Sequence, residues 1–259
     1  MRKRLFVGLA IGVLGMLSRV SVGSEQFCAV GWNGEFTHID SHIGEIPPSR
    51  SDLPGYMQAL AYSSTGVLYA CQSRFLTTTA SLYIIDPVTG DTTHSLWLDV
   101  DVRGMAFSSD ETLYVSVNTS DVVAPPSHLG TINLSDGSYT EIGEFWGEGS
   151  EAQGLAFSPG GELYAIAPDP FPPPYAYSLF TVNTNNAEMH LIGRFEGNRL
   201  AQSIAFTPGG YLYALGHQFA QLDPSTGAII GPVFDLSGDY RGLESAVLPS
   251  GARRWQLYE

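Results

Sequence analysis

The chain has 259 residues, of which 44% are hydrophobic and only 15% are charged. That composition can build a sizeable core, which excludes wholesale disorder. Lys and Arg together number 12 against 26 Asp and Glu, so the formal net charge is -14. An acidic chain repels phosphate backbones and anionic lipids, and this argues against nucleic-acid binding and against binding to anionic membrane surfaces.

The N-terminal segment has the organisation of a secretory signal peptide. Three basic residues at positions 2–4 precede an apolar run over residues 5–17, which is short for a membrane span. Small residues end the segment, so we expect cleavage after Gly23 and a secreted or periplasmic protein. No later stretch is long and apolar enough to cross a membrane, so no membrane association is expected after residues 1–23 are removed.

From residue 57 onward the chain repeats a pattern of short strands. The first strand of each unit is centred on an alanine and ends in a tight polar turn; these alanines are Ala61, Ala106, Ala156 and Ala205. Their spacing of about 45 to 50 residues is typical of a propeller or a repeat array. The second strand always carries Leu-Tyr, and the recurrence of Tyr69, Tyr114, Tyr164 and Tyr213 indicates packing between units rather than chemistry.

A third strand in each unit ends in a turn that begins with Asp or Asn, over residues 86–90, 133–137, 183–187 and 223–227. Such side chains bond to the backbone two residues on, and this favours a turn. A fourth strand follows, and no segment shows helical periodicity. Each unit is therefore expected to be one blade of a β-propeller.

The two ends of the mature chain complete the ring. Residues 26–46 contain a second, third and fourth strand without a first strand, and residues 240–248 contain a first strand alone. Pairing them closes a ring and leaves no open sheet edge. The sequence therefore predicts an all-β protein, a single propeller of five four-stranded blades over residues 24–248, followed by a C-terminal tail at 249–259.

The repeat units resemble those of secreted bacterial propellers with NHL-like or YVTN-like repeats. The likeness rests on Gly154-Leu-Ala-Phe-Ser-Pro-Gly-Gly161, on the Leu-Tyr pairs and on Asp223-Pro-Ser-Thr-Gly227. It implies the architecture and no single function, because such propellers do many jobs. Many relatives end in a Pro-Glu-Pro sorting tail with a hydrophobic helix, which residues 249–259 do not contain.

The two cysteines, Cys28 and Cys71, fall on equivalent strands of neighbouring units. Packed sheets lie about 10 Å apart, which disfavours a disulfide without distortion. The sequence leaves the bridged and the free states open.

Loop lengths separate the two faces of the expected ring. The turns between strands one and two, and between strands three and four, are short and repetitive, and they share one face. The opposite face carries the long and dissimilar connections, over residues 47–56, 73–80, 119–128 and 167–177. Binding sites concentrate on variable loops held by a rigid scaffold, so we expect any site on this long-loop face, at the mouth of the central channel.

The candidate ligand-binding residues gather at that mouth. Long polar side chains occupy one equivalent position in the five first strands, carboxylates stand two residues earlier in three of them, and two aromatic residues lie on nearby loops. They are Gln58, Arg103, Gln153, Gln202 and Arg241; Asp101, Glu151 and Asp239; and Trp146 and Tyr175. One interpretation is a ring that binds an anionic or hydroxyl-rich ligand. The other is that the Asp–Arg pairs neutralise each other and the glutamines bond to neighbouring blades.

No cofactor is expected. Acidic residues crowd the long-loop face and could suit calcium, although no calcium-loop spacing appears. The run from His38 to His42 looks metal-like, but Asp40 aligns with the turn residues of the other units, so a bend is expected there.

The residues show no recognisable catalytic set. The only lysine, Lys3, lies in the segment expected to be removed, and this excludes a lysine nucleophile. We therefore expect an exported propeller that binds a protein or a glycan through its long-loop face without catalysis. The first alternative is a lyase or hydrolase acting on a carbohydrate or lactone at the channel mouth, and the second is a structural protein without a small-molecule site. Lactonase-like propellers gather metal ligands on their inner strands, where this chain has Gln and Arg.

Overall fold

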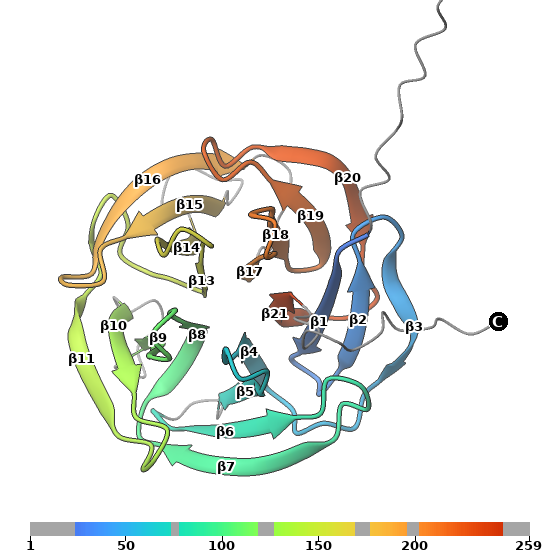
Figure 1. Ribbon diagram of the computed structural model, residues 1–259, viewed down its shortest axis with the longest axis horizontal. Coiled ribbons are helices and arrows are strands. Elements are labelled where there is room, and N and C mark those ends of the chain that lie inside the picture. The colour runs from blue at the N-terminus through green and yellow to red at the C-terminus, as the bar shows by residue number, and fades with distance from the viewer. Residues whose placement is uncertain (1–23, 74–77, 119–126, 169–176, 196–201, 246–259) are drawn as a thin grey trace, which may run out of the picture.

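The computed structural model describes residues 24–73, 78–118, 127–168, 177–195 and 202–245. Over these residues the chain forms strands and turns without a helix. The strands make five antiparallel blades arranged in a ring (Figure 1). The predicted five-bladed propeller is confirmed.

Each blade is built from four consecutive strands running from the centre of the ring outward, except blade I, which takes its inner strand from the C-terminal end. Blade I contains β21 (Tyr240–Ser245), β1 (Gln26–Gly31), β2 (Phe36–Asp40) and β3 (Gly44–Arg50). Blade II contains β4 (Met57–Tyr62), β5 (Leu68–Ser73), β6 (Ala80–Ile85) and β7 (Thr92–Leu98). Blade III contains β8 (Asp101–Phe107), β9 (Leu113–Asn118), β10 (Ser127–Ile132) and β11 (Tyr139–Glu144).

The remaining two blades follow the same order. Blade IV contains β13 (Gly154–Phe157), β14 (Leu163–Pro168), β15 (Tyr177–Val182) and β16 (Glu188–Phe195). Blade V contains β17 (Ser203–Phe206), β18 (Leu212–Leu215), β19 (Gln218–Leu222) and β20 (Ile229–Asp235). A short extra strand, β12 (Trp146–Gly147), pairs in parallel with β16, so blade IV has five strands where four were predicted.

The ring closes through β21 and β1, as the sequence predicts. The two strands run antiparallel, with Phe27 opposite Ser245 and Val30 opposite Gly242. In Figure 1 they lie side by side, next to the last strands of blade V. Closure gives β1 a partner on both sides, β21 and β2, and places β21 as the inner strand of blade I, so β1 does not become an open edge.

The core lies between the blades. Tyr69, Tyr114 and Tyr164 each meet the ring of a phenylalanine on the next blade, with centroids 5.6, 5.3 and 5.0 Å apart. Tyr213 meets Phe27 of blade I at 4.8 Å. The predicted packing role of these tyrosines is confirmed.

The inner strands approach one another very closely. A Cβ built on Gly154 would lie 2.7 Å from the Cα of Ser203 on the next blade, and one on Gly104 would lie 2.9 Å from the carbonyl oxygen of Gln153. Only glycine permits this approach, which draws the inner strands of blades III to V together around the centre.

Both cysteines are buried, free thiols. No helix of the described residues is long and apolar enough to cross a membrane. The expected C-terminal tail at 249–259 lies outside the described residues, as do residues 1–23.

Candidate functional site

The predicted polar ring occupies the start of the inner strands, at their long-loop end. The strand pairing shifts register at Gln58, Arg103 and Arg241, so each of these residues is the extra residue of a β-bulge. A bulge re-aims a side chain relative to its strand, and such irregularities are frequent beside binding sites.

The two arginines are held by the carboxylates that stand two residues earlier. Arg103 pairs with Asp101, which is buried and also accepts a 2.6 Å hydrogen bond from the hydroxyl of Ser73. Arg241 donates to Asp239 from both Nε and Nη2, at 3.2 and 2.9 Å. These ion pairs fix both guanidinium groups in place and neutralise much of their charge.

The glutamines differ among themselves. Gln153 donates to Glu151, and Gln202 donates to the hydroxyl of Tyr177 at 3.3 Å. Gln58 is buried, and its Nε2 finds no acceptor among the described residues. The Nε of Arg103 on the next blade is also buried without an acceptor there. Because an unpaired buried N–H is costly, these two donors are suited to an acceptor held in the ring.

Burial also changes the acidity of the ring. Desolvation raises the pKa of Asp101 and of Glu151, and in both cases the positive charge of Arg103 opposes the rise. Desolvation likewise raises the pKa of Tyr177, with Glu151 adding to the rise and Arg241 opposing it. Charges on different blades therefore act on one another across the ring.

The two predicted aromatic residues do not join this ring in the described structure. Trp146 lies in β12 on the outermost strand of blade IV, where its indole N–H donates to the carbonyl of Asn186 at 2.9 Å. The strand pairing therefore places Trp146 on the outer rim of the propeller. Its position in the sequence, shortly before an inner strand, had predicted a place at the channel mouth. Tyr175 lies outside the described residues.

An aromatic platform at the same end of the inner strands joins the predicted residues Arg241 and Asp239 to two aromatic residues that were not predicted. It consists of Trp32, Tyr56 and Arg241, the last carrying its partner Asp239. The rings of Trp32 and Tyr56 meet edge to face with centroids 4.8 Å apart, and the Arg241 guanidinium lies 4.5 Å from the Trp32 ring. Trp32 follows β1, in the part of blade I that carries no repeat motif, so no alignment pointed to it.

Tyr56 is the exposed member of the aromatic platform. Its side chain is 41% exposed, and its φ is +67°, an uncommon value for a residue other than glycine. Its N–H donates to the Trp32 carbonyl at 2.6 Å, and its carbonyl accepts from Ser73 at 2.9 Å. These two bonds hold the strained backbone in place, and strain of this kind concentrates at functional sites.

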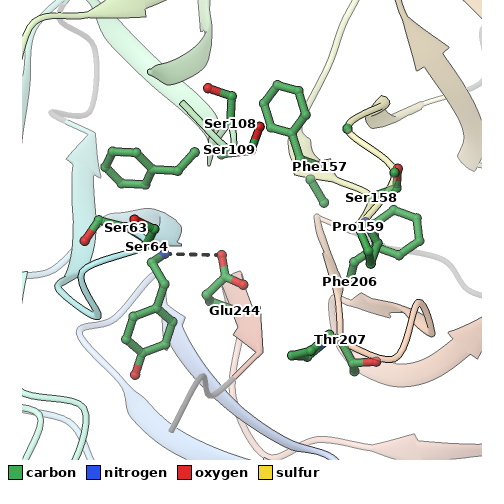
Figure 2. Close-up of a pocket in the computed structure, with 17 residues that line it drawn as sticks. Ser63, Ser64, Ser108, Ser109, Phe157, Ser158, Pro159, Phe206, Thr207 and Glu244 are labelled. Atoms are coloured by element: carbon green, nitrogen blue, oxygen red, sulfur yellow. Dashed lines mark hydrogen bonds between the residues drawn. The ribbon is translucent and has the colours of Figure 1, made fainter. Parts of the chain in front are cut away.

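A pocket opens at the opposite end of the inner strands, on the short-turn face. Its volume is about 410 Å³, and all five inner strands contribute residues to its lining. Tyr62, Phe107, Phe157 and Phe206 occupy one equivalent position in four of those strands. Figure 2 shows Phe157 and Phe206 at the border of the opening, with their rings directed away from its centre, together with Glu244 from β21. Sequence reasoning placed the site on the other face because it relied on loop length.

Glu244 is the only formally charged residue lining this pocket among the described residues. Its carboxylate accepts a hydrogen bond from the backbone N–H of Ser245 at 2.9 Å. It accepts a second from the backbone N–H of Tyr62 at 3.4 Å (Figure 2). Burial raises the pKa of Glu244 to about 8, against the opposing effect of the two N–H groups. The sequence did contain a signal, because Glu244 stands where the other four units have alanine.

No group of three or more His, Cys, Asp or Glu residues within the described part of the chain could hold a metal ion. The predicted bend at Asp40 is present: β2 ends there, and Asp40 accepts a hydrogen bond from the N–H of His42 at 2.7 Å. His38 instead contacts the carbonyl of Pro87 at 2.8 Å.

No protein-family model matches the chain, and no curated protein matches its sequence. Solved structures do match. The nidogen/laminin complex includes a chain that aligns with a TM-score of 0.55 and 12% identity, over 87% of this chain and 99% of that chain. A protein provisionally described as a gluconolactonase aligns with a TM-score of 0.50 and 14% identity, over 85% of this chain and 84% of that chain. Identities this low show a shared fold alone, and the five antiparallel blades of the structure make this fold a β-propeller.

Proposed function

We propose that this chain is an exported, non-catalytic binding propeller whose long-loop face recognises a neutral glycan. The observation that carries the proposal is the exposed ring of Tyr56, held in a strained conformation against Trp32 beside a fixed Arg241–Asp239 pair. Export rests on the predicted signal peptide and on the resemblance of the repeats to those of secreted propellers.

The chemistry of the aromatic platform suits a sugar. An aromatic ring offers an apolar surface to the C–H face of a pyranose, and a fixed arginine–carboxylate pair offers donors and acceptors to its hydroxyls. The unpaired N–H groups of Gln58 and Arg103 add donors at the same end of the inner strands. The net charge of -14 disfavours sulfated or uronic-acid glycans, which leaves neutral ones.

A protein ligand is the second candidate. Trp, Tyr and Arg are the residue types that dominate the energy of protein interfaces, and the aromatic platform contains one of each. One matching fold was solved in the nidogen/laminin complex, so a propeller of this shape can occur in a protein assembly.

The enzymatic alternative is less well supported. Asp101 and Asp239 are already paired with arginines, and Glu151 accepts a hydrogen bond from Gln153. A general acid or base must be free to exchange a proton with a substrate, and these carboxylates already have partners.

The test is binding to neutral cello-, laminari- and chito-oligosaccharides by the secreted chain and two variants. Tyr56→Ala should lower the affinity for the oligosaccharide at least tenfold. Tyr211→Ala is the matched control, because Tyr211 is equally exposed, at 42%, but lies on the short-turn face; it should leave affinity unchanged. Equal affinity of wild type and Tyr56→Ala would contradict the proposal. Absence of any bound oligosaccharide would favour the protein ligand.

A further inference from the structure

Glu244 breaks the repeat at one defined place. In four blades an alanine of the inner strand faces a tyrosine of the second strand, in the pairs Ala61–Tyr69, Ala106–Tyr114, Ala156–Tyr164 and Ala205–Tyr213. In blade I the same position pairs Glu244 with Cys28. The large residue has moved to the inner strand and the small one to the second strand, so a carboxylate reaches the pocket without overfilling the blade.

Packing alone does not account for a carboxylate here. An apolar residue of similar size would fill the space without the cost of burying a charge. Glu244 has only backbone N–H partners, and no Arg or His side chain pairs with it in the described part of the chain. The pocket therefore presents an acceptor that lacks a counter-ion.

The walls of the pocket favour the same kind of ligand. Tyr62, Phe107, Phe157 and Phe206 are among the residues that line the pocket beside Glu244. The three phenylalanine rings also pack against tyrosines of the preceding blades. Aromatic rings attract cations through the negative charge on their faces, and they also cover an apolar body. The hydroxyls of the exposed Ser64 and Ser109 lie at the rim. A volume of about 410 Å³ falls within the usual range for small-molecule sites.

We propose that this central pocket binds a small alkylammonium cation, with Glu244 as the counter-ion and the aromatic side chains as walls. The site is separate from the long-loop face and does not depend on glycan binding there. It lies at the opposite ends of the same inner strands.

Glu244 is the group in this part of the pocket that changes its charge near pH 8, because its titratable neighbours Cys28 and Tyr62 have pKa values that are raised further. Cys28 faces it from β1, and burial raises the pKa of that thiol to about 12. Tyr62 approaches from β4, and burial raises the pKa of its phenol, with Cys28, Glu244 and Asp86 adding to the rise. Both therefore stay neutral between pH 6 and pH 9, roughly, while Glu244 gains its charge. Cation binding should strengthen across this interval.

The test compares choline with 3,3-dimethylbutan-1-ol, which has the same shape without the charge. Calorimetric titration of the secreted chain at about pH 8.5 should show binding of choline at least tenfold tighter than of the alcohol. Choline should bind at least tenfold more weakly at pH 6 than at pH 8.5. Equal affinity for the two compounds, or an affinity that does not change with pH, would overturn the proposal.

Variants distinguish choline binding in the pocket from general attraction of the cation to an acidic surface. Glu244→Gln should reduce choline affinity at least tenfold and should abolish its pH dependence. Glu162→Gln removes an exposed carboxylate on the same face and should leave both unchanged. Phe157→Leu keeps an apolar side chain and should weaken choline severalfold, because it removes a ring from the wall. Choline binding to Glu244→Gln with wild-type affinity would contradict the assignment, as would equal losses in Glu244→Gln and Glu162→Gln.

Discussion

Cys28 and Glu244 face each other across the strand pair that closes the ring, at the position where every other blade pairs a tyrosine with an alanine. The exchange of sizes has a direct consequence for the central pocket. The carboxylate of Glu244 occupies space that an alanine would leave, and the small thiol of Cys28 avoids the overlap that a tyrosine would cause.

This pairing predicts strong coupling between the two positions. Glu244→Ala alone removes buried atoms beside a small neighbour, and Cys28→Tyr alone inserts a ring against the carboxylate. The double variant restores the pair found in the other four blades and should be more stable than the sum of the single changes implies, by about 1 to 3 kcal/mol. Urea unfolding of the four proteins measures this coupling, and strictly additive effects would contradict it.

The raised pKa of Glu244 predicts a pH dependence of stability with a definite sign. In the folded chain the carboxyl keeps its proton up to about pH 8, whereas its ordinary pKa is 4.5. Between these values the folded state binds more protons than the unfolded state, so stability falls as the pH rises, by at most about 1.4 kcal/mol per pH unit. Below pH 4.5 the carboxyl is protonated in both states, so stability no longer depends on pH through this group.

The measurement is the difference in unfolding free energy between Glu244→Gln and wild type, taken from urea unfolding at about pH 5, 6.5, 8 and 9. Other titrating groups cancel in this difference. It should grow in favour of the glutamine variant up to about pH 8 and then level off. Parallel curves for the two proteins would show that the carboxylate is not destabilised by burial.

The buried ion pair of the inner ring should contribute more to the free energy of unfolding than the exposed ion pairs of Arg50. Asp101→Asn leaves Arg103 without its counter-charge in a largely buried place and should destabilise the chain by about 2 to 4 kcal/mol. Arg50→Gln removes exposed pairs with Asp52 and Asp91 and should cost much less. Equal losses in chemical unfolding would indicate that the Asp101–Arg103 pair is effectively solvated.

The close approach of the inner strands predicts that substituting alanine for two nearby glycines will have very different effects on stability. Gly154→Ala would bring a Cβ to 2.7 Å from the Cα of Ser203, and blade IV cannot yield without shifting blade V. We expect a loss of about 1 to 3 kcal/mol. Gly160→Ala in the adjacent turn would meet only a hydroxyl at 3.6 Å and should be tolerated. Similar thermal unfolding of both variants would contradict this packing.

The fold was predictable because the repeats recur at a spacing that is typical of propeller blades. The spacing of Ala61, Ala106, Ala156 and Ala205 gave the blades, and the incomplete units at the two ends gave the closure between β1 and β21. The extra strand β12 was not foreseen, because its pairing with β16 depends on where a connection folds back and not on a repeat.

The candidate site was predictable only in part. Period-2 alternation correctly brought Asp101 beside Arg103 and Asp239 beside Arg241. Trp32 was not predicted because it lies outside the repeat motifs and because its contact with Arg241 forms only when distant ends of the chain meet. The pocket around Glu244 escaped notice because loop length says nothing about a cavity between short turns.

Titration of the chain with neutral oligosaccharides, run beside the Tyr56→Ala and Tyr211→Ala variants, is the measurement that decides the proposed function. We expect saturable binding to wild type and Tyr211→Ala, and at least a tenfold loss of affinity in Tyr56→Ala. An oligosaccharide that binds all three proteins equally would contradict the assignment of the long-loop face as the recognition surface.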